Sequence, residues 1–507
     1  MKKILLIFIL FTNLIFSQKS YLVEKLNSRI RFSGDIVGMD NEPNIGFIGH
    51  GYEVFGLLPQ NKNVYFGVNS YSAITGIRSG FIVFGVFGGI QNKLITDWLN
   101  YDLGLFLGGG GGSGAPDGGG LMIRPHVDLQ AKISDKLSLR AGLAAVTFPS
   151  GAINSLHMSV GAVIHTHSYM VQNTNLVAKT HSNSVFKNID ISALSMNLFN
   201  YSKGPLKTDV NVDKNAPVIS LLGAMLKSHQ ENNLYGVLKL GGAFIGEVDG
   251  FMMLLSGIGY EVPVNKWIVL DAKALIGGAG GGNVQFGGGL ATQIEAGVGV
   301  KVSDYLLNIN VGNTYAPNGN FKSNHLDIAL GKKFNIYTSN SNDRTEVIAR
   351  DNVLKEDFSF STFNRSYVSA NNLDKAGREY DQIFNLIGFE LEKNLNQNFS
   401  LVAATVWAYQ GNYGAYAEGW LGLQYYYALT NKWKATAKTL LGAGGGGDIN
   451  LGSGMAYQYA VGVQKQLNNR WSFIASLGQV RPVSQGNFTP VMIDLGIKIN
   501  IGQLVQR

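Results

Sequence analysis

Three histidines on one expected strand have a spacing that could serve metal binding. His157, His165 and His167 share one parity, so their imidazole rings would point to the same side of a sheet. Imidazole nitrogens are common zinc ligands, but histidines on one strand face also line polar interiors. Because the chain has no cysteine, a thiolate metal site is excluded. We therefore expect polar lining here, with no metal and no cofactor.

Glycine runs at 108–112, 277–282 and 442–447 raise the question of phosphate binding. A phosphate loop needs a strand before it and a helix after it, whereas the residues on both sides of each run favour strands. Residues 446–450 are similar to one turn of a calcium-binding repeat, but such turns bind only in stacked arrays. No serine and histidine are spaced as a nucleophile and its base. We expect no enzymatic activity, and hairpins that bend sharply or approach one another closely.

The glycine runs belong to a unit that occurs three times. Each run is followed at the same spacing by a second glycine group, which ends at Leu121, Leu290 or Met455. A tryptophan and a short polar turn precede each run, and a similar polar turn follows it. Such aligned features indicate internal duplication. The expected organisation is a signal peptide at 1–17 and β repeats at 18–170, 171–345 and 346–507.

The N-terminus has the pattern of a secretory signal peptide. Lys2 and Lys3 precede the apolar run 4–10, and Ser17 is a small residue suited to cleavage. The run is too short for a membrane-spanning helix, which needs about 20 apolar residues. We expect cleavage near Ser17 and export of the remainder.

Composition favours strands and argues against several functions. The chain has 65 glycines, with 11% aromatic and 15% charged residues, a balance that suits strands better than helices. The net charge of +7 is small and scattered, so nucleic acid is not an expected partner. Charges or Gly and Asn interrupt each apolar stretch after the N-terminal run before it reaches transmembrane length. If the chain spans a membrane, it must do so as a closed β-barrel.

Alternation with period two identifies the strands. Within 121–133 and 491–501, odd positions are apolar and even positions are mostly polar. About ten residues is the length of a tilted strand that crosses a membrane. One face should meet lipid and the other a polar interior. The side chains expected to face that interior are Arg124, His126, Asp128, Lys132, Asp271, Lys273, Glu295, Asp494 and Lys498.

Turn lengths and aromatic residues indicate an orientation. Each copy contains about eight strands, so both ends of a copy lie on one side. The turns on that side are short, whereas connections such as 200–217 and 369–382 on the other side are longer. Short periplasmic turns and long outer loops are typical of outer-membrane barrels. Aromatic residues that follow the short turns would form an interface girdle: Trp98, Trp267, Trp433, Trp471 and Tyr305.

The last strand strengthens a resemblance to a known class. Asp494, Gly496, Ile499 and Ile501 have the spacing of the C-terminal assembly signal of outer-membrane β-barrels, although the chain lacks a terminal aromatic and continues to Arg507. With its alternating strands, the chain resembles porin-like outer-membrane β-barrel proteins as a class. The resemblance implies an outer-membrane location, with the bilayer and the barrel-assembly machinery as partners.

Two architectures satisfy these patterns. The preferred expectation is one up-and-down barrel of about 24 antiparallel strands, partly occluded by the glycine hairpins. The alternative is three linked eight-stranded barrels with filled interiors. The first implies a pore or transport channel for solutes, and the second a non-conducting structural or partner-binding protein. A secreted β-repeat adhesin is a further alternative, because a soluble sandwich also alternates.

Overall fold

The computed structural model contains strands but no membrane-crossing helix among its described residues. In the part of the chain that it describes, no helix is both long and apolar enough to cross a membrane. The expected signal peptide, residues 1–17, lies outside the described residues. Those residues are 20–506, except for 59, 97, 175–183, 201–217, 229–231, 247, 249, 340–342, 350–352, 369–372 and 380–382.

Barrel 1 is a closed sheet of eight antiparallel strands, β1 to β8. Consecutive strands pair with each other, and β1 pairs with β8 from Ser20↔Thr174 to Asp35↔Ser159. The strands are Ser20–Val37 (β1), Ile45–Phe55 (β2), Val64–Thr75 (β3), Ile82–Lys93 (β4), Leu99–Gly111 (β5), Met122–Lys132 (β6), Leu137–Thr147 (β7) and Asn154–Thr174 (β8).

Barrel 2 repeats this arrangement with β9 to β16. Its closing pair joins β9 to β16 from Asn324↔Asn200 to Ser339↔Ser184. The strands are Ser184–Asn200 (β9), Ile219–Lys227 (β10), Leu234–Ile245 (β11), Met252–Pro263 (β12), Ile268–Gly280 (β13), Leu290–Val302 (β14), Tyr305–Tyr315 (β15) and Lys322–Ser339 (β16).

Barrel 3 consists of β18 to β25, after the short strand β17 (Thr345–Ala349), which pairs with β1 of barrel 1. It closes through β18 and β25, from Val353↔Gln506 to Val368↔Val491. The strands are Val353–Val368 (β18), Ile383–Asn394 (β19), Phe399–Gln410 (β20), Ala417–Ala428 (β21), Trp433–Gly445 (β22), Met455–Gln466 (β23), Trp471–Pro482 (β24) and Val491–Gln506 (β25).

The expectation of a single barrel of about 24 strands is wrong. Each copy closes on itself because its first and last strands, 16 to 21 residues long, pair with each other over most of their length. That pairing satisfies both sheet edges over most of their length, so neither edge is left to pair with a whole strand of the next copy. Barrels 2 and 3 are joined in their sheets by the pair Ile336↔Val505. The chain forms three separate eight-stranded barrels, which is the arrangement kept as the alternative.

The two faces of the strands differ as alternation requires. Val127, Leu129, Leu143 and Ile497 are exposed on the outer surface, whereas the intervening side chains are buried inside the barrels. An exposed apolar outer face over a buried polar inner face reverses the usual pattern of a soluble protein. Lipid is the solvent that matches such a surface.

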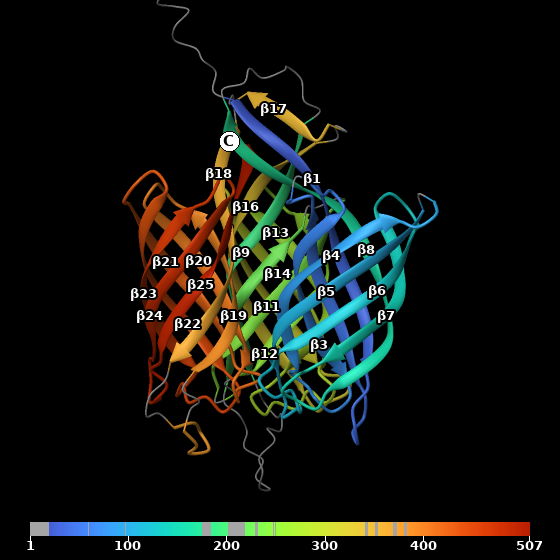
Figure 1. Ribbon diagram of the computed structural model, residues 1–507, viewed down its shortest axis with the longest axis vertical. Coiled ribbons are helices and arrows are strands. Elements are labelled where there is room, and N and C mark those ends of the chain that lie inside the picture. The colour runs from blue at the N-terminus through green and yellow to red at the C-terminus, as the bar shows by residue number, and fades with distance from the viewer. Residues whose placement is uncertain are drawn as a thin grey trace, which may run out of the picture.

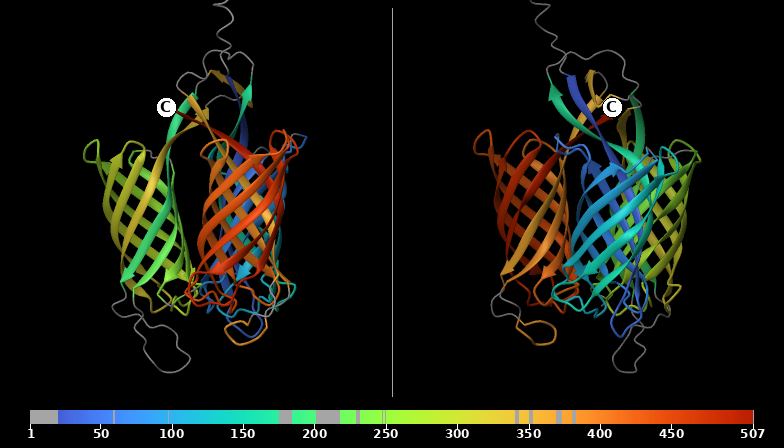
Figure 2. Two further views of the ribbon diagram at one scale, coloured as in Figure 1. Left: turned by 90° about the vertical axis from the view of Figure 1, so that its left-hand side faces the viewer. Right: turned by 45° about the vertical axis from the view of Figure 1, so that its right-hand side comes forward.

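The three barrels stand side by side with roughly parallel axes (Figure 1, Figure 2). The neighbouring strands at their contacts are β3 with β13, β11 with β22, and β20 with β5. In each contact, the third strand of one barrel meets the fifth strand of the next, which gives a cyclic, pseudo-threefold arrangement. The long first and last strands rise beyond the barrels at one end, here called the terminus end (Figure 1). The opposite end, which carries the glycine turns, is called the hairpin end.

Candidate functional site: barrel interiors and the axial pocket

The interior of barrel 1 is a buried network of charges. Arg31 Nε lies 2.7 Å from Glu53 Oε1, and its Nη2 lies 2.8 Å from Asp102 Oδ2. Arg29 also pairs with both carboxylates, and Tyr65 donates to Asp102 at 2.7 Å. All five side chains are fully buried. An eight-stranded barrel is just wide enough for side chains to fill, so these groups satisfy one another instead of lining a water channel.

The interiors of barrels 2 and 3 contain different charged residues, but these are also paired with one another. In barrel 2, Lys273 Nζ lies 3.2 Å from both Asp271 and Glu295. In barrel 3, Arg365 binds Asp494 through two nearly parallel hydrogen bonds of 2.8 and 2.9 Å. Two parallel bonds are the strongest form of arginine–carboxylate pairing. Each interior is therefore compensated internally.

Aromatic clusters fill each barrel toward the hairpin end. Phe81 contacts Phe47 in barrel 1, with ring centroids 5.2 Å apart. In barrel 2, the ring centroids of Phe286 and Phe321 lie 4.3 Å apart. In barrel 3, the corresponding cluster contains Phe384, Tyr413, Tyr416 and Phe488. These rings, with the charged networks above them, occlude the barrels in this structure.

Most side chains expected in a polar interior lie inside a barrel, but in three different barrels. Lys132 differs, because its side chain is exposed at the rim of barrel 1 and pairs with Asp135 at 2.7 Å. It is the last residue of β6, where the sheet no longer encloses it. The buried members of the set are Arg124, His126 and Asp128 in barrel 1, Asp271, Lys273 and Glu295 in barrel 2, and Asp494 and Lys498 in barrel 3.

The aromatic residues expected in a girdle all lie near the terminus end of the barrels. Four are exposed, namely Trp98, Trp267, Trp433 and Tyr305, and Trp471 is half-buried. Trp471 packs beside Ile499 of the adjacent strand. Of the C-terminal motif, Asp494 is buried in the ion pair with Arg365, whereas Ile501 is half-buried.

Among the described residues, no group of three or more His, Cys, Asp or Glu side chains is arranged to hold a metal ion. His165 accepts or donates a hydrogen bond with Ser138 Oγ at 2.8 Å, and His157 lies 3.6 Å from Asp35. These histidines have polar neighbours within barrel 1.

The glycine runs form the same turn in each barrel. The amide of Ala115 donates to Gly112 O at 3.0 Å, and Val284 donates to Gly281 O at the same distance. Ile449 repeats the bond at 3.2 Å. The turn needs a positive φ, near 54° at Ser113 and 56° at the equivalent Gly282, a region that glycine enters at low cost. Three equivalent turns therefore meet at the hairpin end.

These turns bring the barrels into contact backbone to backbone. A Cβ at Gly80 of barrel 1 would lie 2.3 Å from the amide nitrogen of Gly281 in barrel 2. The equivalent Gly250 of barrel 2 approaches Gly446 of barrel 3, at 3.0 Å from such a Cβ. The equivalent residue of barrel 3 is Ala415, which approaches barrel 1: a Cβ at Gly111 would lie 2.9 Å from its amide nitrogen. Any larger side chain at Gly80 would force the barrels apart.

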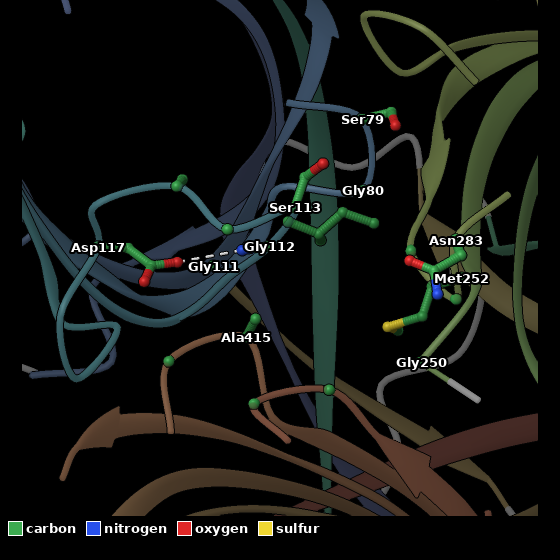
Figure 3. A pocket seen from close by; sticks show the side chains of 18 of the residues that line it. Ser79, Gly80, Gly111, Gly112, Ser113, Asp117, Gly250, Met252, Asn283 and Ala415 are labelled. Carbon is green, nitrogen blue, oxygen red and sulfur yellow. Dashed lines mark hydrogen bonds between the residues drawn. The ribbon is translucent and has the colours of Figure 1, made fainter. Parts of the chain in front are cut away.

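The contacts surround an axial pocket of about 830 Å³ (Figure 3). Gly80, Gly112 and Ser113 of barrel 1 line it, together with Asn283 of barrel 2 and Ala415 of barrel 3. The wall is mostly backbone and small polar side chains, because glycine leaves the amides and carbonyls accessible. Such a wall can hydrogen-bond a polar ligand or a loop of a partner.

The axial pocket has an apolar floor. Ile82 of barrel 1 and Met252 of barrel 2 are equivalent first residues of β4 and β12, and Ala417 begins the equivalent β21. All three belong to one cluster with Trp407, whose indole stacks on Phe84 with centroids 6.0 Å apart. Ile82, Met252 and Trp407 all line the pocket, so this part of its wall is apolar.

Asp117 breaks the symmetry of the pocket. Its Oδ2 accepts a hydrogen bond of 3.1 Å from the Gly112 amide (Figure 3), whereas the equivalent positions hold Phe286 and Leu451. Burial disfavours the ionised carboxylate and raises the pKa of Asp117 to about 7, against weaker opposing effects, first the hydrogen bond from the Gly112 amide and last the charge of Arg78. The side chain therefore carries a titratable proton at an interface between barrels.

Some of these residues were not anticipated from the sequence. Arg29 and Arg31 share one parity with Ser33 and Asp35, so the alternation used for other strands also identifies them as inward-facing. The apolar floor carried no such signal, because Trp407 and Ile82 stand in separate barrels. Only the packing of the barrels brings them together.

Comparison with known proteins gives distant likenesses only. No protein-family model matches the chain, and no curated protein matches it. OpdQ of Pseudomonas aeruginosa is 8% identical, covers 95% of this chain and 98% of its own, and has a TM-score of 0.22. The siderophore receptor PirA of the same organism is 8% identical, with coverage of 94% and 80% and a TM-score of 0.27. OccAB3 of Acinetobacter baumannii is 8% identical, with coverage of 96% and 100% and a TM-score of 0.22. Values this low do not establish a shared fold.

The geometry itself assigns the class. Three closed antiparallel barrels carry exposed apolar side chains outside and buried charged side chains inside. Closed barrels leave no unpaired edge in lipid. The predicted class of closed, antiparallel β-barrel with an apolar outer face is confirmed.

Proposed function

We propose that this protein is a non-conducting, pseudo-trimeric outer-membrane scaffold that presents the axial pocket to the outside of the cell. The observation that carries the proposal is the contrast between occluded barrels and an open pocket built by equivalent turns of all three. A ligand or partner would bind the accessible backbone amides and carbonyls at the pseudo-threefold axis. Export by the signal peptide and assembly through the C-terminal motif form part of the proposal.

The orientation in the membrane follows from the loops. The terminus end carries short turns, such as Ser134 to Lys136, and the expected aromatic girdle. Short turns face the periplasm in outer-membrane barrels. The hairpin end would then face outward.

Single cysteines test this orientation cleanly, because the chain has none of its own. Ser113→Cys places a thiol at the exposed hairpin end, and Lys136→Cys places one in an exposed turn at the terminus end. A membrane-impermeant maleimide added to intact cells should label the first and spare the second. The second should react after the outer membrane is permeabilised. Labelling in the reverse order would contradict the orientation.

Conductance tests the occluded state. The full-length protein in a planar lipid bilayer should give no current steps, because a charged network and an aromatic cluster stand in series in each barrel. Folding of the sample is verified by faster migration of the unheated protein in a detergent gel. Reproducible steps from folded protein would overturn the non-conducting assignment.

A second candidate is a gated pore through barrel 3. That barrel holds a mouth pocket of about 380 Å³ at its terminus end and a further void of about 20 Å³ beside Asp494. Lys498 borders both spaces. Beyond them the aromatic cluster closes the barrel, so these rings would act as the gate.

Matched variants separate the two candidates. Tyr416→Ala with Phe488→Ala removes two rings from the cluster of barrel 3, and Phe286→Ala with Phe321→Ala does the same in barrel 2. Current from the first pair alone would favour the pore. Silence from both pairs, in folded protein, would favour the scaffold.

A further inference from the structure

We propose that the terminus-end mouth of barrel 3 is a binding site for a phosphate-bearing anion. The mouth pocket, of about 380 Å³, lies between the ends of β18, β22, β23 and β25, and the last residues of β8 from barrel 1 cover part of it. Its charged lining is strongly unbalanced, with one carboxylate, Asp357, against five cations. The cations are Lys355, Lys432, Lys434, Arg470 and Lys498.

Three of the five cations already have a carboxylate partner. Lys355 lies 2.6 Å from Asp357, Arg470 pairs with Glu24 of β1, and Lys498 pairs with the buried Glu392. Each of these three cations therefore has a carboxylate beside it, although Glu24 is shared with Arg344.

The other two cations lack such a partner. Within the described residues, no carboxylate oxygen lies within 4.0 Å of the ammonium group of Lys432 or Lys434. Lys434 instead stands over the ring of Tyr426, 5.4 Å from its centroid. An aromatic face attracts a cation but adds no negative charge. About two positive charges remain at the pocket, a surplus that an anion would neutralise.

Barrel 2 shows how the same position can be compensated from within. The tenth residue of β12 is Glu261, and the tenth residue of β21 is Tyr426. Glu261 lies 3.0 Å from Lys301 and 3.2 Å from Lys333. Tyr426 instead accepts a hydrogen bond from Lys498 at 2.7 Å. At this position barrel 3 has the neutral Tyr426, whereas barrel 2 has Glu261, whose carboxylate pairs with the lysines at the barrel mouth.

The rest of the lining supplies hydrogen-bond donors. The carboxamides of Asn431, Gln466 and Asn500 make no side-chain hydrogen bond within the described part of the chain, and they border the pocket. Two ammonium groups with several N–H donors suit an oxyanion with three or more oxygens, because each oxygen accepts more than one bond. A phosphate group meets that requirement better than a single carboxylate.

The phosphate could belong to a soluble molecule or to a lipid headgroup. Lys432 precedes the exposed Trp433 at the barrel rim, which in the proposed orientation lies near the periplasmic leaflet. Both sources share the same chemistry, so the site itself does not depend on the axial pocket or on conduction.

Binding to the full-length protein tests the site directly. Inorganic phosphate titrated into folded protein in a neutral detergent should bind with an affinity that falls as salt rises. The double variant Lys432→Gln with Lys434→Gln should lose at least about tenfold in affinity. The matched control is Lys266→Gln, which alters the equivalent turn of barrel 2 next to Trp267. It should leave binding unchanged.

A third variant addresses the cause. Tyr426→Glu installs the internal carboxylate of barrel 2 and cancels about one of the two surplus charges, so the affinity for phosphate should fall while the unheated protein still migrates as a folded barrel. In nanodiscs, binding of phosphatidylglycerol that needs both lysines, without binding of inorganic phosphate, would identify the lipid source. The proposal is overturned if neither probe binds the unaltered protein, or if Lys266→Gln weakens binding as much as the double variant.

Discussion

The two ends of the molecule hold the three barrels together in different ways. At the hairpin end, the contact of Gly80 with Gly281 is repeated by Gly250 with Gly446, and both are approaches of backbone to backbone. At the terminus end, the contacts are made by side chains and differ from barrel to barrel. Glu24 of β1 reaches Arg344 at 3.0 Å and also pairs with Arg470 of barrel 3.

The apolar packing at the terminus end is also unequal. Tyr169 of barrel 1 and Tyr337 of barrel 2 meet edge to face, with ring centroids 5.4 Å apart, and Leu504 of barrel 3 joins their cluster. The extra strand β17 adds to β1 alone. Close backbone contact admits only glycine or alanine and so keeps the copies equivalent, whereas side-chain contacts can be replaced one at a time.

The largest effect is expected from filling the hairpin-end contact. Gly80→Val adds a side chain where a Cβ alone would lie 2.3 Å from the Gly281 nitrogen, at a φ of 78° that valine disfavours. We expect a loss of at least about 3 kcal/mol in the free energy of unfolding, measured by urea titration in micelles.

The control for this substitution is Gly242→Ala in β11. A Cβ there would meet no atom within 4 Å, so stability should change by less than about 1 kcal/mol. Equal losses in the two variants would show that close approach of the barrels does not govern stability at this end.

A smaller effect, dependent on pH, is expected at Asp117. Its folded pKa of about 7 lies above the ordinary aspartate value of 3.8, so the folded state binds the proton more tightly. The stabilisation is fully present below about pH 4 and is lost as pH rises through 7. Asp117→Asn keeps an acceptor for the Gly112 amide without the charge. At pH 8 the free energy of unfolding of the variant should be higher than that of the unaltered protein by about 2 kcal/mol. Thermal unfolding recorded across pH measures this difference. If Asp117→Asn showed the same dependence of stability on pH as the unaltered protein, Asp117 would not be the cause of that dependence.

The smallest effect is expected at the terminus end. Glu24→Gln removes the carboxylate that joins Arg344 and Arg470, whose side chains are partly exposed. Pairs of this kind contribute about 0.2–1 kcal/mol. The urea midpoint should fall slightly at low salt and converge with that of the unaltered protein at high salt. A loss as large as that of Gly80→Val would mean that side chains at the terminus end hold the barrels as strongly as the glycine turns do.

Much of the local structure was predictable from residue type. Val127 and Ile497 were expected on an outer apolar face, and both are exposed there. The chemical interpretation of the inner face was less complete, because Arg124 and Asp128 looked equally suited to a channel wall and to an ion-paired core. Their partners, Asp35 and Arg140, stand on other strands, so strand pairing in space was needed to find them.

The sequence by itself determined the strands, their faces, the three equivalent copies and the places where glycine allows sharp turns, because each follows from local periodicity or backbone freedom. Only the tertiary structure decided how many barrels form. Neighbouring strands pair identically in eight-stranded and 24-stranded sheets, and the alternatives differ only in whether β8 pairs with β1 or with β9. That choice is made between strands far apart in the sequence, and the alternation of apolar and polar residues is the same for either pairing. It also sets the barrel radius, and so turned an expected polar lining into a packed, charge-paired interior.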